Sequence, residues 1–303
     1  MVYAEGEEET VLRAVQSVVD YTLAFPILIG RPEVIEMRIQ RLGLRLREGV
    51  DFELTNINDD PRFNEYWQQY HTMTERRGVT PDAAKNLLRS RPTLIAAIMV
   101  ERGEADAMIC GLVGRYHKKL GYLRSVFGLD PGVQCTSAID THVQVDPSAE
   151  QIAEAAMQAS YRLKLFGIEP KVALLSHSNF GSHDNPSAAK MRKVREILKA
   201  RAPRLEVDGE MQADTAWDET LRRRILPSST LAGRANLFVM PNLDSANIVY
   251  NMVRVMTDGV AIGPILMGVD KPAHILTTAS SVRRVVNMTA IAAVDAQIRA
   301  GRA

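Results

Sequence analysis

The residues of this chain that could do chemistry gather in hydroxyl- and glycine-rich stretches that follow apolar runs. The clearest stretch is Ser176-His-Ser-Asn-Phe-Gly-Ser182, which follows Val172-Ala-Leu-Leu175 and precedes a predicted helix. Backbone N–H groups in such loops, like those at helix N-termini, favour anions such as phosphate. An internally hydrogen-bonded turn explains the same sequence equally well. The candidate anion-binding residues of this loop are Ser176, Ser178, Asn179, Gly181 and Ser182.

A second candidate site is the basic segment Gly114-Arg-Tyr-His-Lys-Lys-Leu-Gly-Tyr-Leu-Arg124, which follows another apolar run. Lys119 and Arg124 are its possible phosphate contacts, because an ammonium group or a guanidinium fork suits a phosphate. A solvated basic helix accounts for the segment just as well. The run Arg222-Arg223-Arg224 is interpreted as such a solvated helix face.

Composition argues against several classes of function. The formal net charge of +1 gives no reason to expect nucleic acid or an anionic membrane as a partner. Cys110 and Cys135 match no zinc or redox spacing and lie in apolar surroundings, which predicts buried, reduced thiols. The histidines form no His-x-x-x-His pair, so no metal site is expected. No apolar stretch is long enough for a membrane span and no signal peptide is recognisable, so a cytoplasmic location is expected.

Strand-like apolar runs alternate with segments of helical periodicity through most of the chain. This order predicts an α/β fold with a mostly parallel sheet. Continuous apolar runs such as Val172-Ala-Leu-Leu175 favour strands that are buried on both faces. The stretch Val2-Tyr-Ala-Glu-Gly6 is expected to form the first strand and its loop. The other predicted strands cover residues 26–30, 52–57, 105–111, 136–145, 172–178, 236–241 and 260–266.

Capping signals mark the beginnings of several helices. Thr80-Pro81 places a capping hydroxyl before a proline and predicts a helix through residues 83–89. Ser148 and Gln151 have the spacing of a capping box. Asn185-Pro186 predicts the start of another helix.

A later helix is expected to begin at Ser245 and to contain Ile248, Met252 and Met256 at helical spacing. The methionines are interpreted as core filler rather than as ligands. The chain contains neither a Walker loop nor a Gly-x-Gly-x-x-Gly fingerprint. It also lacks repeats and low-complexity linkers, so composition alone does not reveal a division into two domains.

Five ordered motifs carry a resemblance to a known enzyme family. Residues 5–13 resemble that family's "GEDERVL" stretch, residues 175–182 its "LS(F/Y)STxGS" loop, and residues 208–214 its "DGELQFD" motif. Residues 232–241 with Asn247 resemble "AGKANVFIFPDLEAGN", and residues 262–268 with Lys271-Pro272 resemble "IGPILQGLAKP". Together they resemble the phosphate acetyltransferase/butyryltransferase family over almost the whole chain.

This resemblance implies two α/β domains with mostly parallel sheets and a ligand cleft between them, in a topology like that of isocitrate and isopropylmalate dehydrogenases. The first domain would combine residues 1–134 with 267–303, and the second would be the insertion 135–266. The family dimerises through the second domain, so self-association as a dimer or higher oligomer is implied. By motif position, Lys271, Thr277 and Thr278 join Lys119, Arg124 and the 176–182 loop as candidate acyl-CoA or phosphate contacts.

The charged catalytic groups of the family are replaced in this chain. The family has Ser-Arg-Gly-Cys-Ser where this sequence has Thr277-Thr-Ala-Ser-Ser281, so its catalytic arginine falls at Thr278. The aspartate assigned as the base for the CoA thiol falls at Arg284, and a phosphate-site arginine falls at Thr74. The arginine of the family's "TLRP" motif is the one that is retained, as Arg124, followed by Ser125 in place of the proline. The loss of one such group costs roughly 10²–10³ in rate. No catalytic residue is therefore expected, although threonine hydroxyls can still hydrogen-bond an acyl carbonyl.

The segments 274–277 and 282–292 further resemble the carboxyl-terminal domain of bacterial multidomain NADP-dependent malic enzymes. In that group the transferase-like domain is considered regulatory and binds acetyl-CoA. The resemblance implies acetyl-CoA as a ligand and no cofactor in this chain. NADP and a divalent metal would belong to an absent catalytic domain of the same full-length chain, which decarboxylates malate. The abrupt start at Val2 is expected for a fragment.

Two other hypotheses stay open. The chain could be an active phosphate acetyltransferase in which Arg284 or Lys119 substitutes for the lost arginine. Alternatively, it could be a pure assembly module that takes no ligand.

Overall fold

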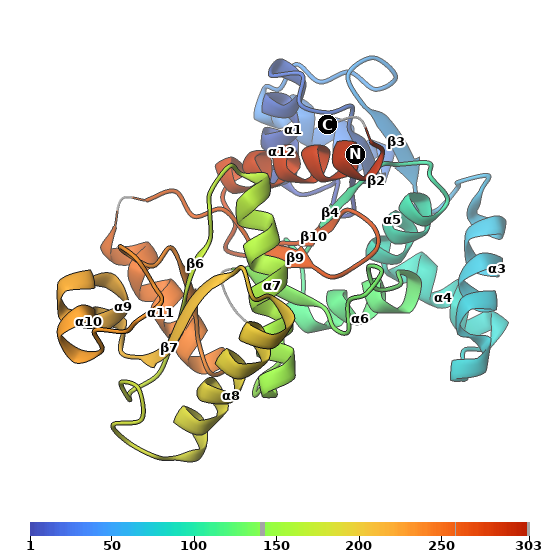
Figure 1. Cartoon of the computed structure of the whole chain (residues 1–303). Coiled ribbons are helices and arrows are strands. Elements are labelled where there is room, and N and C mark those ends of the chain that lie inside the picture. Colours follow the sequence, from blue (N-terminus) through green and yellow to red (C-terminus); the bar gives the residue numbers. More distant parts are fainter. Residues whose placement is uncertain (140–142, 258, 302–303) are drawn as a thin grey trace. The chain divides into compact units, whose positions relative to one another are not determined.

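The computed structural model describes residues 1–139, 143–257 and 259–301, in which helices and strands alternate as an α/β fold (Figure 1). The chain forms two compact units. Unit 1 comprises Met1–Asp130 and Ala261–Ala303, and unit 2 comprises Pro131–Val260. The cleft expected between two domains stays a prediction.

Unit 1 is built on a five-stranded sheet with the order β10-β4-β1-β2-β3. All neighbouring strands are parallel, and central β1 pairs through Val2 with Ile27 on one side and with Met108 on the other. Its strands are β1 (Val2–Tyr3), β2 (Ile27–Gly30), β3 (Glu53–Asn56), β4 (Met108–Cys110) and β10 (Ala273–Ile275), and β9 (Ile265–Met267) precedes β10.

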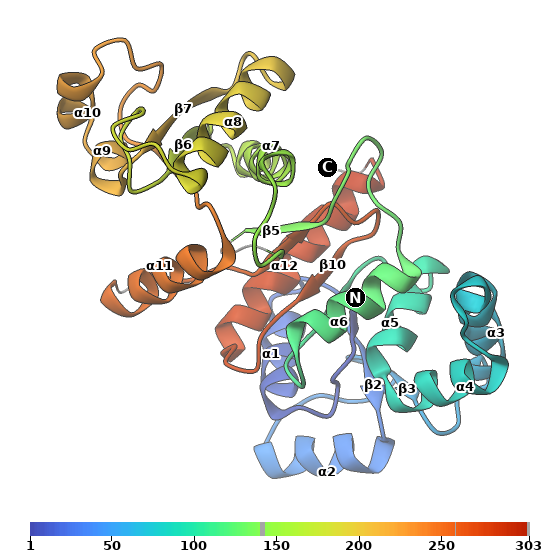
Figure 2. The same ribbon diagram turned by 90° about the horizontal axis from the view of Figure 1, so that it is seen from below.

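Helices lie on both sides of this sheet. Figure 2 shows α1 (Glu9–Asp20) and α12 (Val282–Arg299) on one side, and α5 (Pro92–Glu101) and α6 (Tyr116–Val126) on the other. Residues 93–100 of α5 are all buried, as expected for a helix that is apolar all round. The remaining helices of this unit are α2 (Pro32–Leu42), α3 (Phe63–Thr74), the short 3₁₀ turn Glu75–Arg77 and α4 (Pro81–Ser90).

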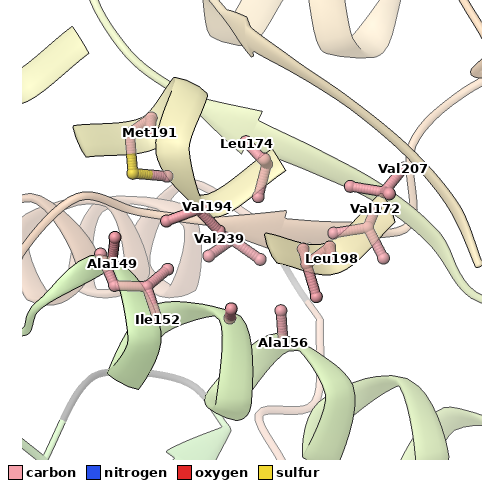
Figure 3. Close-up of a cluster of buried hydrophobic side chains, with 11 residues drawn as sticks. Ala149, Ile152, Ala156, Val172, Leu174, Met191, Val194, Leu198, Val207 and Val239 are labelled. Atoms are coloured by element: carbon pink, nitrogen blue, oxygen red, sulfur yellow. The ribbon is translucent and has the colours of Figure 1, made fainter. Parts of the chain in front are cut away.

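Unit 2 contains a three-stranded parallel sheet in the order β7-β6-β8. Central β6 (Lys171–Leu175) is buried on both faces. Val172 and Leu174 join the apolar cluster of Figure 3, which also contains residues of α7 (Ala149–Leu165) and α8 (Pro186–Arg201). Ala173 and Leu175 pack into a second cluster with Met211 and Ala216. The continuous apolar run therefore fills two cores, as the sequence predicts.

The other elements of unit 2 are short apart from one helix. The strands are β5 (Ser137–Ile139), β7 (Glu206–Met211) and β8 (Leu237–Val239), and the helices are α9 (Ala213–Trp217), α10 (Glu219–Ile225) and α11 (Leu243–Met256). In the part of the chain that the structure describes, no helix is both long and apolar enough to cross a membrane.

Three predicted helix starts are confirmed. Thr80 accepts a hydrogen bond from the Ala83 N–H, Ser148 and Gln151 form the complete capping box, and Asn185 caps α8. The predicted start at Ser245 is wrong, because Asn242 is the N-cap of α11 and its side chain accepts from the Ser245 N–H.

One interpretation of side-chain environment is wrong, and another is wrong for one of its three residues. Met252 and Met256 of α11 are 55% and 77% exposed, so neither fills the core of this chain. In the run Arg222–Arg224, Arg223 and Arg224 are exposed as interpreted, but Arg222 is fully buried. Its guanidinium donates to the backbone carbonyls of Thr215 and Leu231, at 2.9 and 3.1 Å, which ties α10 to two neighbouring segments. Cys110 is buried as predicted, whereas Cys135 is half-buried.

Most predicted strands exist, but they are shorter than expected. The strand predicted over 136–145 is observed as β5, and residues 140–142 of that prediction lie outside the described residues. The strand predicted over 260–266 begins only at Ile265. Strands β7 and β10 are absent from the prediction, because β7 carries buried acidic residues and β10 has a buried histidine, His274, at its centre.

Candidate functional site

The loop between β10 and α12 carries the threonines that stand in place of the resembled family's Ser-Arg pair. The Thr277 N–H donates to Ser280 Oγ at 3.2 Å, and the Ser280 N–H donates to the Thr277 carbonyl at 3.0 Å. Ser281 caps α12 by accepting from the Arg284 N–H at 3.3 Å. Thr278 is exposed. The loop therefore presents a neutral hydroxyl beside the N-terminus of an 18-residue helix, a place that favours an anion or a polarised carbonyl.

This corner offers binding groups but no proton acceptor of its own. The first turn of α12 has no acidic residue, and Arg284 lies in it with 8% exposure. A guanidinium is always protonated in proteins, so it cannot act as the general base for a thiol. The residues Thr277–Arg284 can hold a ligand but cannot themselves deprotonate one.

Gly111 brings the ends of β4 and β10 together next to this corner. The Leu276 N–H donates to the Cys110 carbonyl at 2.7 Å. A Cβ atom on Gly111 would lie 2.3 Å from the Leu276 carbonyl oxygen, and Gly111 has a φ of 104°. Only glycine fits this close approach without strain. The carboxyl ends of β4 and β10 are therefore fixed side by side.

Lys119 is held by a buried carboxylate at the same edge of the sheet. Its Nζ donates to Glu5 Oε1 at 2.6 Å and to Thr93 Oγ1 at 2.7 Å. The other Glu5 oxygen accepts from the Gly111 N–H at 3.0 Å. Burial raises the pKa of Glu5, and the nearby ammonium of Lys119 opposes this rise. Lys119 thus links α6 to β1 and α5, and two of its three N–H donors are already used.

The predicted loop 176–182 lies in unit 2, at the carboxyl end of β6, and its donors point to a carboxylate of the same unit. Ser178 Oγ donates to Glu210 Oε1 at 2.9 Å, and the Gly181 N–H donates to the same oxygen at 2.8 Å. Arg192 of α8 adds a third donor at 3.1 Å. Glu210 is fully buried, so it occupies the position that an anion would take in this loop.

The rest of this loop is also satisfied internally. Asn179 exchanges two hydrogen bonds with Gln212, at 2.8 and 3.1 Å, and its N–H donates to Ser182 Oγ at 2.9 Å. Ser176 Oγ accepts from the Ser178 N–H at 3.3 Å. In this structure the loop is the hydrogen-bonded turn that the sequence left open as its alternative.

The remaining predicted contacts are dispersed within unit 1. Arg124 is exposed in the last turn of α6. Lys271 lies 3.8 Å from Glu101, before β10 begins, and so at the opposite end of the strand from Thr277. Thr74 is 1% exposed and donates to the Tyr70 carbonyl at 2.7 Å, within its own helix. Thr277, Thr278 and Lys119 share the carboxyl edge of the sheet, whereas Lys271 and Thr74 do not join them.

Sequence reasoning missed three residues that organise these places: Glu5, Thr93 and Glu210. Glu5 and Glu210 both lie in motifs of the resembled family, so the motif position was a usable signal. Glu5 is 114 residues away from its partner Lys119 along the chain, and Glu210 is 29 residues away from its partner Gly181. No local sequence pattern reveals pairing over such distances. Within the described residues, no group of three or more His, Cys, Asp or Glu side chains is arranged to hold a metal ion.

Comparison with known proteins places these features in a family. The family model described as "Phosphate acetyl/butaryl transferase" matches residues 1–293. An NADP-dependent malic enzyme of Escherichia coli is 52% identical over 98% of this chain, which spans only 41% of that protein. A phosphate acetyltransferase of Nitratidesulfovibrio vulgaris is 34% identical over 99% of the chain and 44% of its own length. The solved phosphotransacetylase from Streptococcus pyogenes matches with a TM-score of 0.88 and 29% identity, over 98% of this chain and 93% of its own. The chain therefore belongs to the phosphate acetyl/butaryl transferase family.

Proposed function

We propose that this chain is an acetyl-CoA-binding regulatory module of an NADP-dependent malic enzyme, without transferase activity of its own. The observation that carries the proposal is the β10–α12 corner. There an exposed threonine hydroxyl meets a helix N-terminus, while the segment Thr277–Arg284 contains no carboxylate. Such a corner can accept a thioester carbonyl or a phosphate but cannot turn it over.

The transfer reaction makes clear what is lacking. In that reaction phosphate attacks the thioester carbonyl, the C–S bond breaks, and acetyl phosphate and the CoA thiol leave. The reverse step needs a base to deprotonate the thiol, and both directions need positive charge for the phosphate and the developing oxyanion. Thr278 and Arg284 supply neither the arginine nor the carboxylate that the resembled enzymes carry at these two positions.

The malic enzyme relatives support the second half of the proposal. Within the matched segment about half of the residues are identical, and the chain spans about two-fifths of the length of these relatives. A catalytic part beyond the matched segment would carry the NADP- and metal-dependent decarboxylation of malate. Acetyl-CoA bound to this chain would regulate that reaction by favouring one arrangement of the assembly, a dimer or higher oligomer, over another.

Binding is tested by thermal denaturation of the purified chain with increasing acetyl-CoA. A ligand that binds only the folded state raises the midpoint temperature, because it adds about 2.7 kcal/mol to the free energy of unfolding when its concentration is 100 times Kd. Thr278→Glu places a negative charge at the corner and should raise the Kd at least tenfold. Thr220→Glu is the matched control, because Thr220 is an exposed threonine in the first turn of α10. Absence of any stabilisation at millimolar acetyl-CoA would leave the assembly-module hypothesis in its place.

Phosphate acetyltransferase activity is the second candidate function, favoured by the family membership and by the likeness to solved phosphotransacetylases. Phosphate acetyltransferase activity would need a cation in place of the arginine that Thr278 replaces. Lys119 is poorly suited, because its ammonium is 2.6 Å from Glu5 and its side chain is only 13% exposed. Formation of acetyl phosphate from acetyl-CoA and phosphate by the native chain would favour this candidate over the regulatory one.

A further inference from the structure

A pocket of about 480 Å³ opens at the carboxyl edge of the unit 1 sheet. It is lined by residues that follow four different strands: Glu5 after β1, Arg31 after β2, Ile57 after β3 and Gly114 after β4. Central β1 has β2 on one side and β4 on the other. In open α/β sheets, ligands bind beyond the strand ends at such a point. The volume lies within the range of small-molecule sites.

The carboxylates that line this pocket are each matched by a cation. Glu5 is 2.6 Å from Lys119, and Glu7 is 2.8 Å from Arg31. The Arg31 guanidinium lowers the pKa of Glu7, so this carboxylate stays ionised. Glu8 is 4.0 Å from Arg38, which lies outside the pocket lining.

Further cations line the pocket without a carboxylate partner among the residues that the structure describes. Arg91 is held only by neutral groups, with Nε donating to Tyr122 Oη and Nη1 to the Ser90 carbonyl, both at 2.9 Å. The Arg89 guanidinium lies 5.3 Å from the centre of the Phe63 ring. The set with uncompensated charge is Arg89, Arg91, Arg115 and Lys118.

Three helices also begin at this pocket with an unfavourable residue. Arg31, Arg91 and Arg115 are the N-caps of α2, α5 and α6, and none of their side chains caps the helix. An arginine there meets the positive end of the helix dipole, where an anion or an acceptor side chain is preferred. A bound anion would interact favourably with the three helix N-termini and would also neutralise the surplus positive charge of the lining.

We propose that this pocket binds a diphosphate group carried by a small organic molecule. Two linked phosphates supply the negative charge that the surplus of cations requires, and they can engage arginine forks from several helices at once. Ile29, Ile57 and Val113 in the lining provide apolar surface for the organic part of the ligand. The corner Thr277–Ser281 is not part of this lining, so the proposal goes beyond the proposed function and does not depend on it.

The test uses inorganic pyrophosphate as the probe in thermal denaturation of the purified chain, at constant ionic strength. The variant Arg115→Gln/Lys118→Gln removes two exposed cations that line the pocket. We expect saturable stabilisation of the native chain and at least a tenfold rise in Kd in this variant. The control Arg204→Gln/Arg224→Gln removes two exposed cations of unit 2 and should stay within twofold. Equal Kd values for pyrophosphate in the two variants would overturn the proposal. Stabilisation of the native chain by pyrophosphate that is no larger than stabilisation by sulfate would overturn it too.

A competition arm identifies the source of the diphosphate. If acetyl-CoA displaces pyrophosphate and the pocket variant also weakens acetyl-CoA binding, the diphosphate is that of the coenzyme. If ADP displaces pyrophosphate but acetyl-CoA does not, the ligand is a free phosphorylated metabolite. Either result supports the pocket. Stabilisation by acetyl-CoA with no effect of pyrophosphate or ADP would contradict it and leave the acetyl-CoA proposal standing.

Discussion

Two strand-to-helix corners of this protein differ in what satisfies their donors. In unit 2, the loop after β6 donates Ser178 Oγ and the Gly181 N–H to Glu210, which is fully buried. In unit 1, the edge after β1 and β4 is lined by Arg115 and Lys118, which have no carboxylate partner among the described residues. The first corner carries its own anion, whereas the second has an uncompensated positive charge.

This difference shows why donor-rich loops are ambiguous in a sequence. The stretch 176–182 has the hydroxyls and glycine that are typical of an anion site. It is nevertheless an internally hydrogen-bonded turn, because the neighbouring strand β7 supplies the Glu210 carboxylate as the acceptor of its donors. The basic segment 114–124 looks like an ordinary solvated helix, yet its position at the sheet edge gives it a pocket. The strand pairing decides which corner is available to a ligand, and this pairing is not local.

Removal of the internal anion should produce the largest effect. Glu210→Ala leaves Arg192 and the loop donors without their acceptor, and we expect unit 2 to lose roughly 3–5 kcal/mol of stability in chemical denaturation. Added phosphate should restore part of this loss, because it can occupy the vacated position. Glu196→Ala, at an exposed position of α8, is the control and should cost about 0.5 kcal/mol or less. A loss below 1 kcal/mol for Glu210→Ala would mean that the carboxylate does not organise the loop.

The edge of unit 1 should be most sensitive at Gly111. Gly111→Ala forces a Cβ against the Leu276 carbonyl at a φ of 104°, so we expect a loss of about 2–4 kcal/mol. Gly43→Ala is the matched control, because Gly43 also has a positive φ but nothing within 4 Å of the added atom, and it should cost about 1 kcal/mol. Equal losses in denaturation midpoints would show that the close approach of β4 and β10 carries no energy.

A smaller effect is expected for the pair that joins β1 to α6. In a double-mutant cycle of Glu5→Gln and Lys119→Met, the coupling energy should be about 1.5–3 kcal/mol, because the pair is buried and hydrogen-bonded. Chemical denaturation of the four proteins gives this value. A coupling near zero would mean that Lys119 is free to serve a ligand, which would revive its role as a substitute for the missing arginine.

The smallest effect is a change in the pH dependence of unit 2. Burial acts to raise the pKa of Asp208, but hydrogen bonds from Ser229 Oγ and from the Thr230 and Gly209 N–H groups outweigh it and lower the pKa. Because the pKa of Asp208 is lower in the folded than in the unfolded protein, the ionised carboxylate stabilises the fold at pH values above its unfolded-state pKa of about 4. This stability is lost as the pH falls through the folded-state pKa. Asp208→Asn should therefore be less stable at pH 7 and lose less on acidification. Parallel pH profiles of the two proteins would contradict this assignment.

Much of the fold could be predicted from local pattern, and the failures have physical causes. The run Val172–Leu175 predicted a strand buried on both faces because every side chain is apolar. Strand β7 was missed because Asp208 and Glu210 are polar in sequence and become buried only through partners in other elements. Ser245 was a plausible cap, but Asn242 lies three residues earlier with an equally suitable side chain.

The candidate site was predicted less completely than the fold. Thr277 and Thr278 are candidates by motif position and Lys119 by its basic segment, and all three lie at one edge of a sheet. Lys271 was placed with them by motif position but lies at the other end of β10, since a three-residue strand separates it from Thr277. Arg115 and Lys118 belong to the basic segment 114–124 but were not singled out within it. Only the convergence of three helix starts shows their common pocket.

We propose above that this chain binds acetyl-CoA without turning it over. Equilibrium dialysis of the chain against acetyl-CoA labelled in its acetyl group, with phosphate present, tests both halves in one measurement. We expect the protein to retain label, all of this label to be recovered as acetyl-CoA, and no labelled acetyl phosphate to form. Labelled acetyl phosphate in proportion to time and protein, or no retained label at all, would contradict it.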